Sequence, residues 1–369
     1  MNEEIKKAIT EIFFSNFKEK IKEESLEEFL LSKKKEDLEK ILKINTVIIN
    51  DKDYLNKISN LNKNELVKEI INNIDSIYKN ILINVDILIY DQIEDYIKSY
   101  KSNIMTIKIN KLNYSPALFQ ILSTFLISKI NYDKDKGIIE IYTPKELISV
   151  LKDLFKDKSI EKECENNSEI IDNVESLIQT YGVIELSELI NIYNNVFDEI
   201  DEEDLKTRIF IDPFFDEKIH IVNEFSDYLI YGLGFNSDKE AQEFLMKLPK
   251  KLDYKIYTKE EYDEIREGSY HYNIDVFDVL HDFLTLHLGM NDDQVFDFDE
   301  MFVLDYMYSY QLDSSTAKKN LSNNLNKMMP DLDFTDKAHL SKIILSIAKN
   351  YPNYNFKGHT YNEVGDKYR

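Results

Sequence analysis

The chain has 369 residues, of which 31% are charged and 43% hydrophobic, and it contains only 8 Gly and 6 Pro. This composition is typical of a soluble globular chain with more than one core. So few turn residues argue against a sandwich or barrel, which turns every ~8–12 residues. No apolar run reaches the ~18 residues of a membrane span, and the charged start MNEEIKKAITEIFF differs from a secretory signal. The single cysteine, Cys164, excludes an intrachain disulfide or a cysteine-cluster metal site, so we expect a cytoplasmic protein without cofactors.

The charge is divided unevenly along the chain. Residues 1–157 contain 25 Lys and Arg against 26 Asp and Glu, a net charge of −1. Residues 158–369 contain 21 basic and 43 acidic residues, a net charge of −22. An acidic half repels nucleic acid and attracts basic surfaces, so we expect the two halves to bind different partners.

Residues 1–75 are expected to form short helices that pack on one another. Ser25 and Glu28 form a capping-box pattern that opens a helix over Leu26–Leu31. Apolar periodicity predicts further helices over Lys35–Ile44, Lys52–Ile58 and Lys63–Ile74.

Residues 76–157 are expected to combine helices with a hairpin. The pattern predicts a helix over Ile77–Tyr100, bent near Asp91, and another over Ser115–Ile127 with Pro116 in its first turn. Alternation over Ile127–Tyr142 around Asp133–Gly137 predicts a β-hairpin. Thr143 is the predicted cap of a following helix, with Pro144 and Glu146 in its first turn.

Residues 158–235 have the order of a winged helix. A polar link over Lys158–Glu169 precedes a helix over Ile170–Tyr181 that ends at Gly182. Further helices are predicted over Leu189–Val196 and from Asp201, followed by two short strands over Lys218–Val222 and Asp227–Tyr231.

Residues 236–369 are expected to be helical and to end in an aromatic tail over Tyr351–Tyr361. The predicted helices are Lys239–Leu248, Lys259–Gly268, Asn273–Leu288, Asp299–Gln311, Ser315–Met329 and Asp336–Lys349. The fold class is therefore mainly α, a multi-module helical protein with winged-helix-like units that carry two small β-hairpins. The expected modules are 1–75, 76–157, 158–235 and 236–369.

Four stretches carry a resemblance to known proteins. Leu38–Leu42 followed by Ile58–Ile70 resembles the Rho-factor N-terminal or SAP-like helical module, a leucine-bearing helix, a link, and then Leu-x-Lys-x-Glu-Leu-x-x-x-Ile. Thr180–Leu189 and Pro352–Val364 resemble segments of loosely characterised cytoplasmic proteins from low-GC bacteria and their phages. This chain departs from them in the longer link Asn45–Lys52 and in having no cysteine motif after Val364. The resemblance implies nucleic-acid association or a scaffold role and brings no catalytic residues.

The candidate nucleic-acid contacts are lysines of the first module, because lysines at helix starts suit phosphate binding. They are Lys33, Lys34, Lys35, Lys57, Lys63 and Lys68. Residues 1–75 contain 14 basic and 16 acidic residues, so a basic patch there depends on how the lysines are placed. We expect weak oligonucleotide binding by 1–157 and not by 158–369.

The candidate protein-binding surface lies in residues 267–317, which contain eleven acids and no Lys or Arg. Its predicted centre is Asp292, Asp293, Asp297 and Asp299, and its expected partner is a basic protein surface. Most aromatic residues of this segment are expected to be buried.

Histidines in the same segment suggest a metal site or a core. On a single helix over 271–288, His271, Asp275, Asp278 and Asp282 would share one face and could bind a divalent cation. A solvated acidic face is the simpler interpretation of these four residues, and His281 is predicted to be a buried core residue.

Three functions follow from these patterns. The first is a non-enzymatic cytoplasmic binding or regulatory protein that contacts nucleic acid weakly through its N-terminal module and binds protein through its acidic half. The second is a phage or mobile-element inhibitor whose acidic face mimics nucleic acid. The third is a metal-dependent hydrolase that uses the His271 and Asp282 face.

Overall fold

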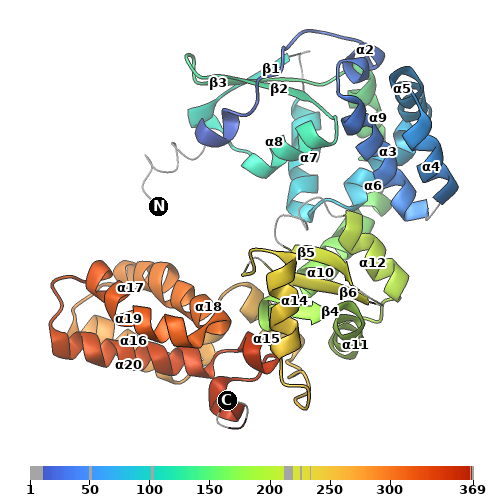
Figure 1. The fold of residues 1–369 in the computed structure, drawn as a ribbon. Helices are drawn as coiled ribbons and strands as arrows, with labels where there is room; N and C mark the ends of the chain where they lie inside the picture. The colour runs from blue at the N-terminus through green and yellow to red at the C-terminus, as the bar shows by residue number, and fades with distance from the viewer. Residues whose placement is uncertain are drawn as a thin grey trace. The chain divides into compact units, whose positions relative to one another are not determined.

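The chain forms two compact units, drawn in Figure 1. The computed structural model describes residues 11–49, 52–100, 104–211, 219–224, 227–232, 234–365 and 367. Unit 1 comprises Met1–Glu169 and Lys206–Asp212, and unit 2 comprises Ile170–Leu205 and Pro213–Arg369. Both units are mainly helical and each contains one small antiparallel sheet, which confirms the predicted mainly α fold with two small β elements. The predicted four modules remain a finer division that the two units do not test.

The N-terminal helices of unit 1 are short and pack on one another. They are α2 (Leu26–Leu31), α3 (Lys35–Ile49), α4 (Lys52–Asn60), α5 (Lys63–Asn72) and α6 (Ile74–Ile83). The predicted capping box of Ser25 and Glu28 opens α2. Helix α3 packs against α4, α5 and α6, because none of these helices is long enough to be stable alone.

The predicted long helix over Ile77–Tyr100 is two helices, and it breaks earlier than expected. Helix α6 ends at Ile83, and α7 (Ile87–Ser99) begins after Asp86, whose carboxylate accepts the Leu88 N–H at 2.7 Å. Asp91 lies within α7 and is exposed. The helix breaks here because the Asp86 carboxylate caps the start of α7, so a new helix begins at Ile87.

The sheet of unit 1 contains the predicted hairpin and one further strand. Strands β2 (Lys129–Asp133) and β3 (Ile138–Tyr142) pair antiparallel, and β1 (Ile104–Lys108) pairs with the other edge of β3, giving the order β1-β3-β2. Helix α8 (Pro116–Thr124) begins after Ser115 as predicted. Sequence analysis missed strand β1 because its side chains are all half-buried or exposed.

Thr143 does not cap the helix that follows the hairpin. Helix α9 (Lys145–Leu154) begins after Pro144 without a side-chain cap. The Thr143 hydroxyl is buried, 2.8 Å from the Tyr96 hydroxyl and 2.6 Å from the Ser128 hydroxyl. The partners of this hydroxyl come from α7 and the segment after α8, and sequence spacing could not reveal them.

The predicted acidic link over Lys158–Glu169 is helical. One helix, α10 (Lys158–Tyr181), covers both the link and the helix predicted after it. Ile160, Cys164 and Asn167 are buried at helical spacing, in phase with Ile171 and Val174. Sequence analysis missed this part of the helix because the acidic residues on its other side make the segment polar in average composition.

The sheet of unit 2 repeats the order of the first sheet. After α10 come β4 (Val183–Glu185), α11 (Leu186–Val196), α12 (Glu202–Ile211), β5 (Ile219–Glu224) and β6 (Asp227–Gly232). The strands are antiparallel in the order β4-β6-β5, so the first strand again pairs with the third. The two predicted strands are confirmed, and β4 is an addition three residues long.

The rest of unit 2 is helical (Figure 1). Its helices are α14 (Asp238–Lys247), α15 (Lys259–Arg266), α16 (Val276–Asp282), α17 (Asp292–Phe298), α18 (Leu304–Leu312), α19 (Ser314–Met328), α20 (Phe334–Asn350) and α21 (Tyr361–Val364). Buried residues from Phe277 to Tyr351 form one large core, whereas Ala241 packs in a separate cluster with Val183 and Tyr231 of the sheet. Two π-helical turns, Phe283–His287 and Asp299–Val303, interrupt the helices predicted over 273–288 and 299–311. Most aromatic residues of 267–317 are buried as predicted, among them Phe277, Phe283, Phe298, Phe302, Tyr306 and Tyr310.

Candidate binding surfaces

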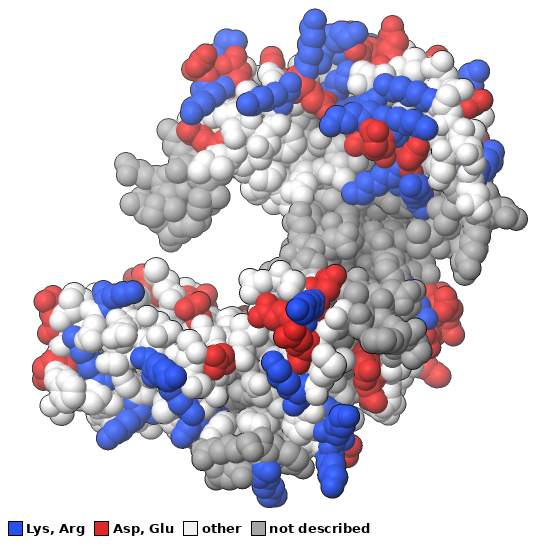
Figure 2. Space-filling model, viewed as in Figure 1, with Lys and Arg blue, Asp and Glu red and all other residues white. Residues whose placement is uncertain are grey.

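The six candidate nucleic-acid lysines differ in what surrounds them. Lys34 and Lys68 are exposed, and Lys63 is half-buried. Lys35 forms an ion pair with Glu39 at 3.3 Å and Lys57 one with Glu69 at 3.2 Å. Figure 2 shows lysines over the drawn face of unit 1 with acidic side chains between them. Any basic surface here therefore rests mainly on Lys34, Lys63 and Lys68.

The start of α5 is already capped, which changes how Lys63 could contact a phosphate. The Asn62 side chain accepts the N–H groups of Asn64 and Glu65 at 3.0 and 3.1 Å, and the Glu65 carboxylate accepts the Asn62 N–H at 2.7 Å. A phosphate at this helix start would meet a carboxylate instead of open N–H groups. Contact with a phosphate would have to come from lysine side chains alone.

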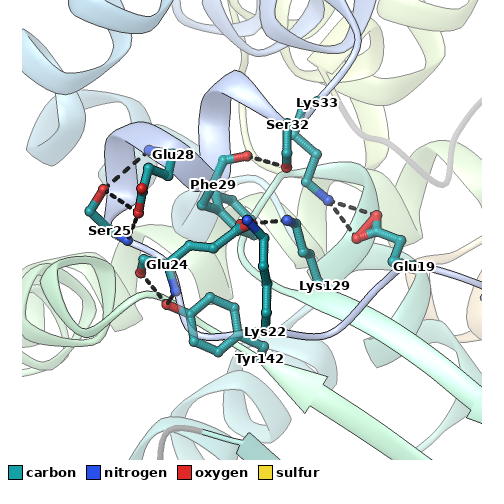
Figure 3. Close-up of polar contacts among 10 residues, drawn as sticks. All are labelled: Glu19, Lys22, Glu24, Ser25, Glu28, Phe29, Ser32, Lys33, Lys129 and Tyr142. Atoms are coloured by element: carbon teal, nitrogen blue, oxygen red, sulfur yellow. Dashed lines mark hydrogen bonds and ion pairs between the residues drawn. The ribbon is translucent and has the colours of Figure 1, made fainter.

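Lys33 lies in the interior of unit 1 and not on its surface. It is 7% exposed, its ammonium group lies 2.7 and 2.8 Å from the two carboxylate oxygens of Glu19, and it covers the Phe29 ring at 4.9 Å (Figure 3). Burial lowers the pKa of the Lys33 ammonium group, which Glu19 only partly offsets. We therefore correct the expectation for Lys33, because its charge is enclosed and paired.

Lys129 and Glu24 form a second buried ion pair beside Lys33. The Lys129 ammonium group donates to Glu24 at 2.5 Å, and Lys22 contacts the other carboxylate oxygen at 2.8 Å (Figure 3). Although burial opposes it, hydrogen bonds from Lys129 and Lys22 lower the pKa of the Glu24 carboxyl. The Tyr142 hydroxyl accepts the Glu24 N–H at 2.8 Å and donates to the Glu24 carbonyl.

The Lys129–Glu24 ion pair holds one segment, residues 17–33, against the sheet of unit 1, and we call this segment the strap; the Lys33–Glu19 pair lies within it. The Glu19 N–H donates to the Ile130 carbonyl at 3.2 Å, and the Tyr132 N–H donates to the Phe17 carbonyl at 2.9 Å. The strap therefore lies along the outer edge of β2. Sequence analysis missed Glu24 and Lys129, because a lysine in an alternating strand normally faces water.

Three of the four predicted protein-binding acids are on the surface. Asp292, Asp293 and Asp297 are exposed on α17, and among the residues that the structure describes they form no ion pair. Asp299 is 2% exposed, and its carboxylate accepts the Tyr272 hydroxyl at 2.8 Å. The expectation for Asp299 is therefore wrong: it faces the core, where the π-helical turn begins.

The four candidate metal ligands are not brought together. His271 lies in a 3-10 helix, Tyr270–Asn273, is fully buried, and places its Nε2 atom 2.8 Å from Asp299 Oδ2. Asp275, Asp278 and Asp282 are exposed at or within α16. Within the described ranges no three His, Cys, Asp or Glu side chains are placed to hold a metal ion. The single helix that the metal hypothesis required is interrupted at residues 274 and 275.

The buried histidine is not the one predicted. His281 is exposed, whereas His271 has no exposed surface. The inner face of α16 consists of Phe277 and Leu280, and the π-helical turn then carries Phe283 and Leu284 inward. Extrapolating one straight helix to Leu288 placed His281 on this face incorrectly.

Cys164 is buried, and its thiol has a hydrogen-bond partner. Its thiol donates to the Val85 carbonyl at 3.2 Å, and burial raises the pKa of the Cys164 thiol to about 12. A thiol in this state forms almost no thiolate near neutral pH.

Comparisons with known proteins supply no further assignment. The chain matches no protein-family model, no curated protein and no solved structure. The Rho-N or SAP-like resemblance of the N-terminal module therefore stays a prediction. Among the described residues, no helix is long and apolar enough to cross a membrane.

Proposed function

We propose that this protein is a non-enzymatic cytoplasmic binding or regulatory protein whose acidic α17 face binds a basic protein surface. The observation that carries the proposal is that Asp292, Asp293 and Asp297 are exposed and form no ion pair with any residue that the structure describes. Their mutual repulsion costs stability unless a cationic partner approaches. Phe296 lies between them in the helix and is 59% exposed, so a protein partner could bury apolar area as well as charge.

Nucleic-acid contact is the second part of the proposal and is assigned to Lys34, Lys63 and Lys68. Exposed or half-buried lysines without a fixed acidic partner can neutralise phosphates, which gives weak, salt-dependent and sequence-independent binding. The capped start of α5 limits this contact to side chains. Weak affinity is therefore the expectation.

A winged-helix assignment of residues 158–235 is supported by connectivity. Helix α10, β4, α11, α12, β5 and β6 follow one another with the sheet order β4-β6-β5. A winged helix usually reads DNA with its third helix. Here the first turn of α12 contains Glu202, Glu203 and Asp204, so we propose protein contacts for this helix.

The acidic face is tested by charge reversal in the full chain. Asp292→Lys, Asp293→Lys and Asp297→Lys together should abolish capture of a basic partner from the native host. A control with Glu165→Lys, Asp198→Lys and Glu199→Lys makes the same change in net charge at exposed positions elsewhere. The proposed face would be contradicted if both variants lost the partner equally, or if neither variant lost it.

The lysine contact is tested by the salt dependence of oligonucleotide binding. Lys34→Gln, Lys63→Gln and Lys68→Gln should weaken binding and reduce the slope of log affinity against log salt by about 0.7–0.9 for each lost phosphate contact. The control variant changes Lys134, Lys145 and Lys152, which are exposed lysines of the same unit. If the control variant loses affinity to the same extent, oligonucleotide binding does not depend specifically on the lysines of the N-terminal module.

A nucleic-acid mimic is the second candidate, favoured by the eleven acids of 267–317 without one Lys or Arg. A mimic would compete with DNA or RNA for its partner. An ordinary protein contact would persist when nucleic acid is added. Adding oligonucleotide to the captured complex separates the two functions.

A further inference from the structure

The C-terminal half of the chain is not uniformly acidic. Residues 267–317 contain eleven acids and no Lys or Arg, whereas residues 318–358 contain seven Lys and three Asp. On the face of unit 2 drawn in Figure 2, lysines lie over α20 and around the C-terminal segment. The net charge of −22 over residues 158–369 therefore conceals a cationic stretch, residues 318–358.

A groove of about 740 Å³ opens in this cationic part. It is lined by the end of α14, the start of α19 and the segment around the 3-10 helix Tyr354–Phe356. Three lysines line it: Lys247, Lys318 and Lys319. All three are exposed, and within the described part of the chain none forms an ion pair.

One of these lysines is held in place by aromatic rings. The Lys318 ammonium group lies 5.4 Å from the centre of the Tyr310 ring and 5.0 Å from that of Tyr361. Ring faces attract a cation without neutralising it, so the full charge remains available to a ligand.

The acid in the groove wall, Asp313, is engaged with the helix start. Asp313 caps α19: its carboxylate accepts the N–H groups of Ser315 and Thr316 at 3.0 and 3.1 Å and the Thr316 hydroxyl at 2.6 Å. Hydrogen bonds from Thr316 lower the pKa of the Asp313 carboxyl, so it stays ionised at neutral pH. Three cations against this one acid among the described lining residues leave the groove with an excess of positive charge.

One wall of the groove, which contains Asn353 and Asn355, is held by hydrogen bonds within the protein. The Gln311 amide donates to the Pro352 carbonyl at 2.8 Å, and the Asn355 amide donates to the Gln311 carbonyl at 2.8 Å. Asn353 is 1% exposed and accepts the Asn355 N–H at 3.0 Å. A pre-formed wall reduces the ordering cost of binding.

We propose that this groove binds a small phosphorylated anion with two or more negative charges, of the pyrophosphate or nucleoside diphosphate class. Lysines are point charges suited to phosphate, and the volume lies within the range of pockets for small ligands. A nucleic-acid strand is disfavoured, because residues 158–369, which contain the groove, carry a net charge of −22 and would repel a long polyanion outside it. This site is additional to the proposed contact through Lys34, Lys63 and Lys68.

The test is calorimetric titration of the full chain with pyrophosphate, ADP and adenosine. Pyrophosphate and ADP should bind and adenosine should not, because the phosphates carry the recognition. Lys247→Gln with Lys319→Gln should weaken pyrophosphate binding at least about tenfold, since two charge-assisted contacts are lost. These two lysines are chosen because Lys318 also contacts rings, whose packing its loss would disturb.

Matched controls distinguish the groove from lysines elsewhere on the chain. Lys342→Gln removes an exposed lysine of α20 that does not line the groove, and it should leave affinity within about twofold. The variant of Lys34, Lys63 and Lys68 should also bind pyrophosphate normally, so failure of that contact does not affect this result. No binding of pyrophosphate, equal binding of adenosine, or equal loss in Lys342→Gln would overturn the proposal. The proposal would also be overturned if an oligonucleotide bound more tightly than ADP and lost its affinity in the same double variant, because the groove would then be a nucleic-acid site.

Discussion

The strap, residues 17–33, and the C-terminal tail, residues 351–364, are both fastened to their units, but by different interactions. The strap is held to the rest of unit 1 by the buried ion pair Lys129–Glu24, and the pair Lys33–Glu19 links two parts of the strap itself. The tail is held to unit 2 mainly by neutral hydrogen bonds and ring packing. Charged fastenings respond to pH and fail sharply when one partner is lost, whereas neutral ones do not titrate near neutral pH.

The C-terminal tail is attached to unit 2 mainly by uncharged groups. The Tyr257 hydroxyl donates to the Gly358 carbonyl at 2.7 Å, and the Lys255 N–H donates to the Lys357 carbonyl at 3.0 Å. The ring of Tyr354 packs directly on the backbone of Gly182, at the end of α10. The ion pair of Lys255 with Glu363 is partly exposed, so it adds little.

The largest expected effect is the loss of one strap cation. Lys129→Met leaves the Glu24 carboxylate, 2% exposed, with Lys22 as its remaining ion-pair partner. Removing one partner of a buried pair typically costs about 3–5 kcal/mol in the free energy of unfolding. Urea unfolding should show this loss, and Glu24→Gln added to Lys129→Met should recover part of it.

An exposed pair in the same unit supplies the control. Lys156 and Asp153 are 75% and 69% exposed and 2.7 Å apart, so Lys156→Met should cost less than about 1 kcal/mol. A similar loss in the two lysine variants would show that burial does not distinguish the strap pair.

The tail is tested at the glycine beneath Tyr354. Gly182 has φ +75°, and a Cβ there would lie 2.5 Å from the Tyr354 ring. Gly182→Ala should cost about 3 kcal/mol, because left-handed strain and overpacking add. Gly289 has φ +71° with nothing within 4 Å of a Cβ, so Gly289→Ala should cost only about 1–2 kcal/mol in the same thermal or urea unfolding measurement. Equal losses would mean that Tyr354 does not pack as described.

Unit 2 also contains a buried acidic residue, Asp299, so buried acids are not confined to unit 1. Asp299→Ala would leave the His271 ring and the Tyr272 hydroxyl without their acceptor and should cost about 1–3 kcal/mol. Asp297→Ala, two residues earlier and exposed, should change stability by less than about 0.5 kcal/mol. Comparable effects on the urea midpoint would indicate that Asp299 is not enclosed.

The smallest expected effect is a difference in acid sensitivity. The pKa of Glu24 is lowered from its ordinary value of 4.5, so the unfolded state binds its proton more readily. The resulting stabilisation is present above pH 4.5 and is lost as pH falls through the lower folded pKa. Urea midpoints measured from pH 6 to 3 should fall less steeply in Glu24→Gln than in the wild type. Gly182→Ala, which alters only the neutral tail contacts, should keep the wild-type slope.

Signals that act within one or two turns were sufficient to predict much of the secondary structure. Ser25 with Glu28, Ser115 with Pro116, and Gly182 each lie where the sequence predicts a helix to begin or end. Both hairpins follow from alternation next to turn residues. The acidic α17 face was also predictable for Asp292, Asp293 and Asp297, since charged residues without a partner normally remain in water.

Only the tertiary structure decided which polar residues are enclosed. Lys33, Lys129, His271 and Asp299 resemble surface residues in sequence, yet each is buried within hydrogen-bond distance of a polar partner. Lys129 and Glu24 are 105 residues apart, and His271 and Asp299 are 28 apart. A buried charge is tolerable only where its partner is already in place. Local periodicity cannot specify that partner, because the packing of distant elements brings the two groups together.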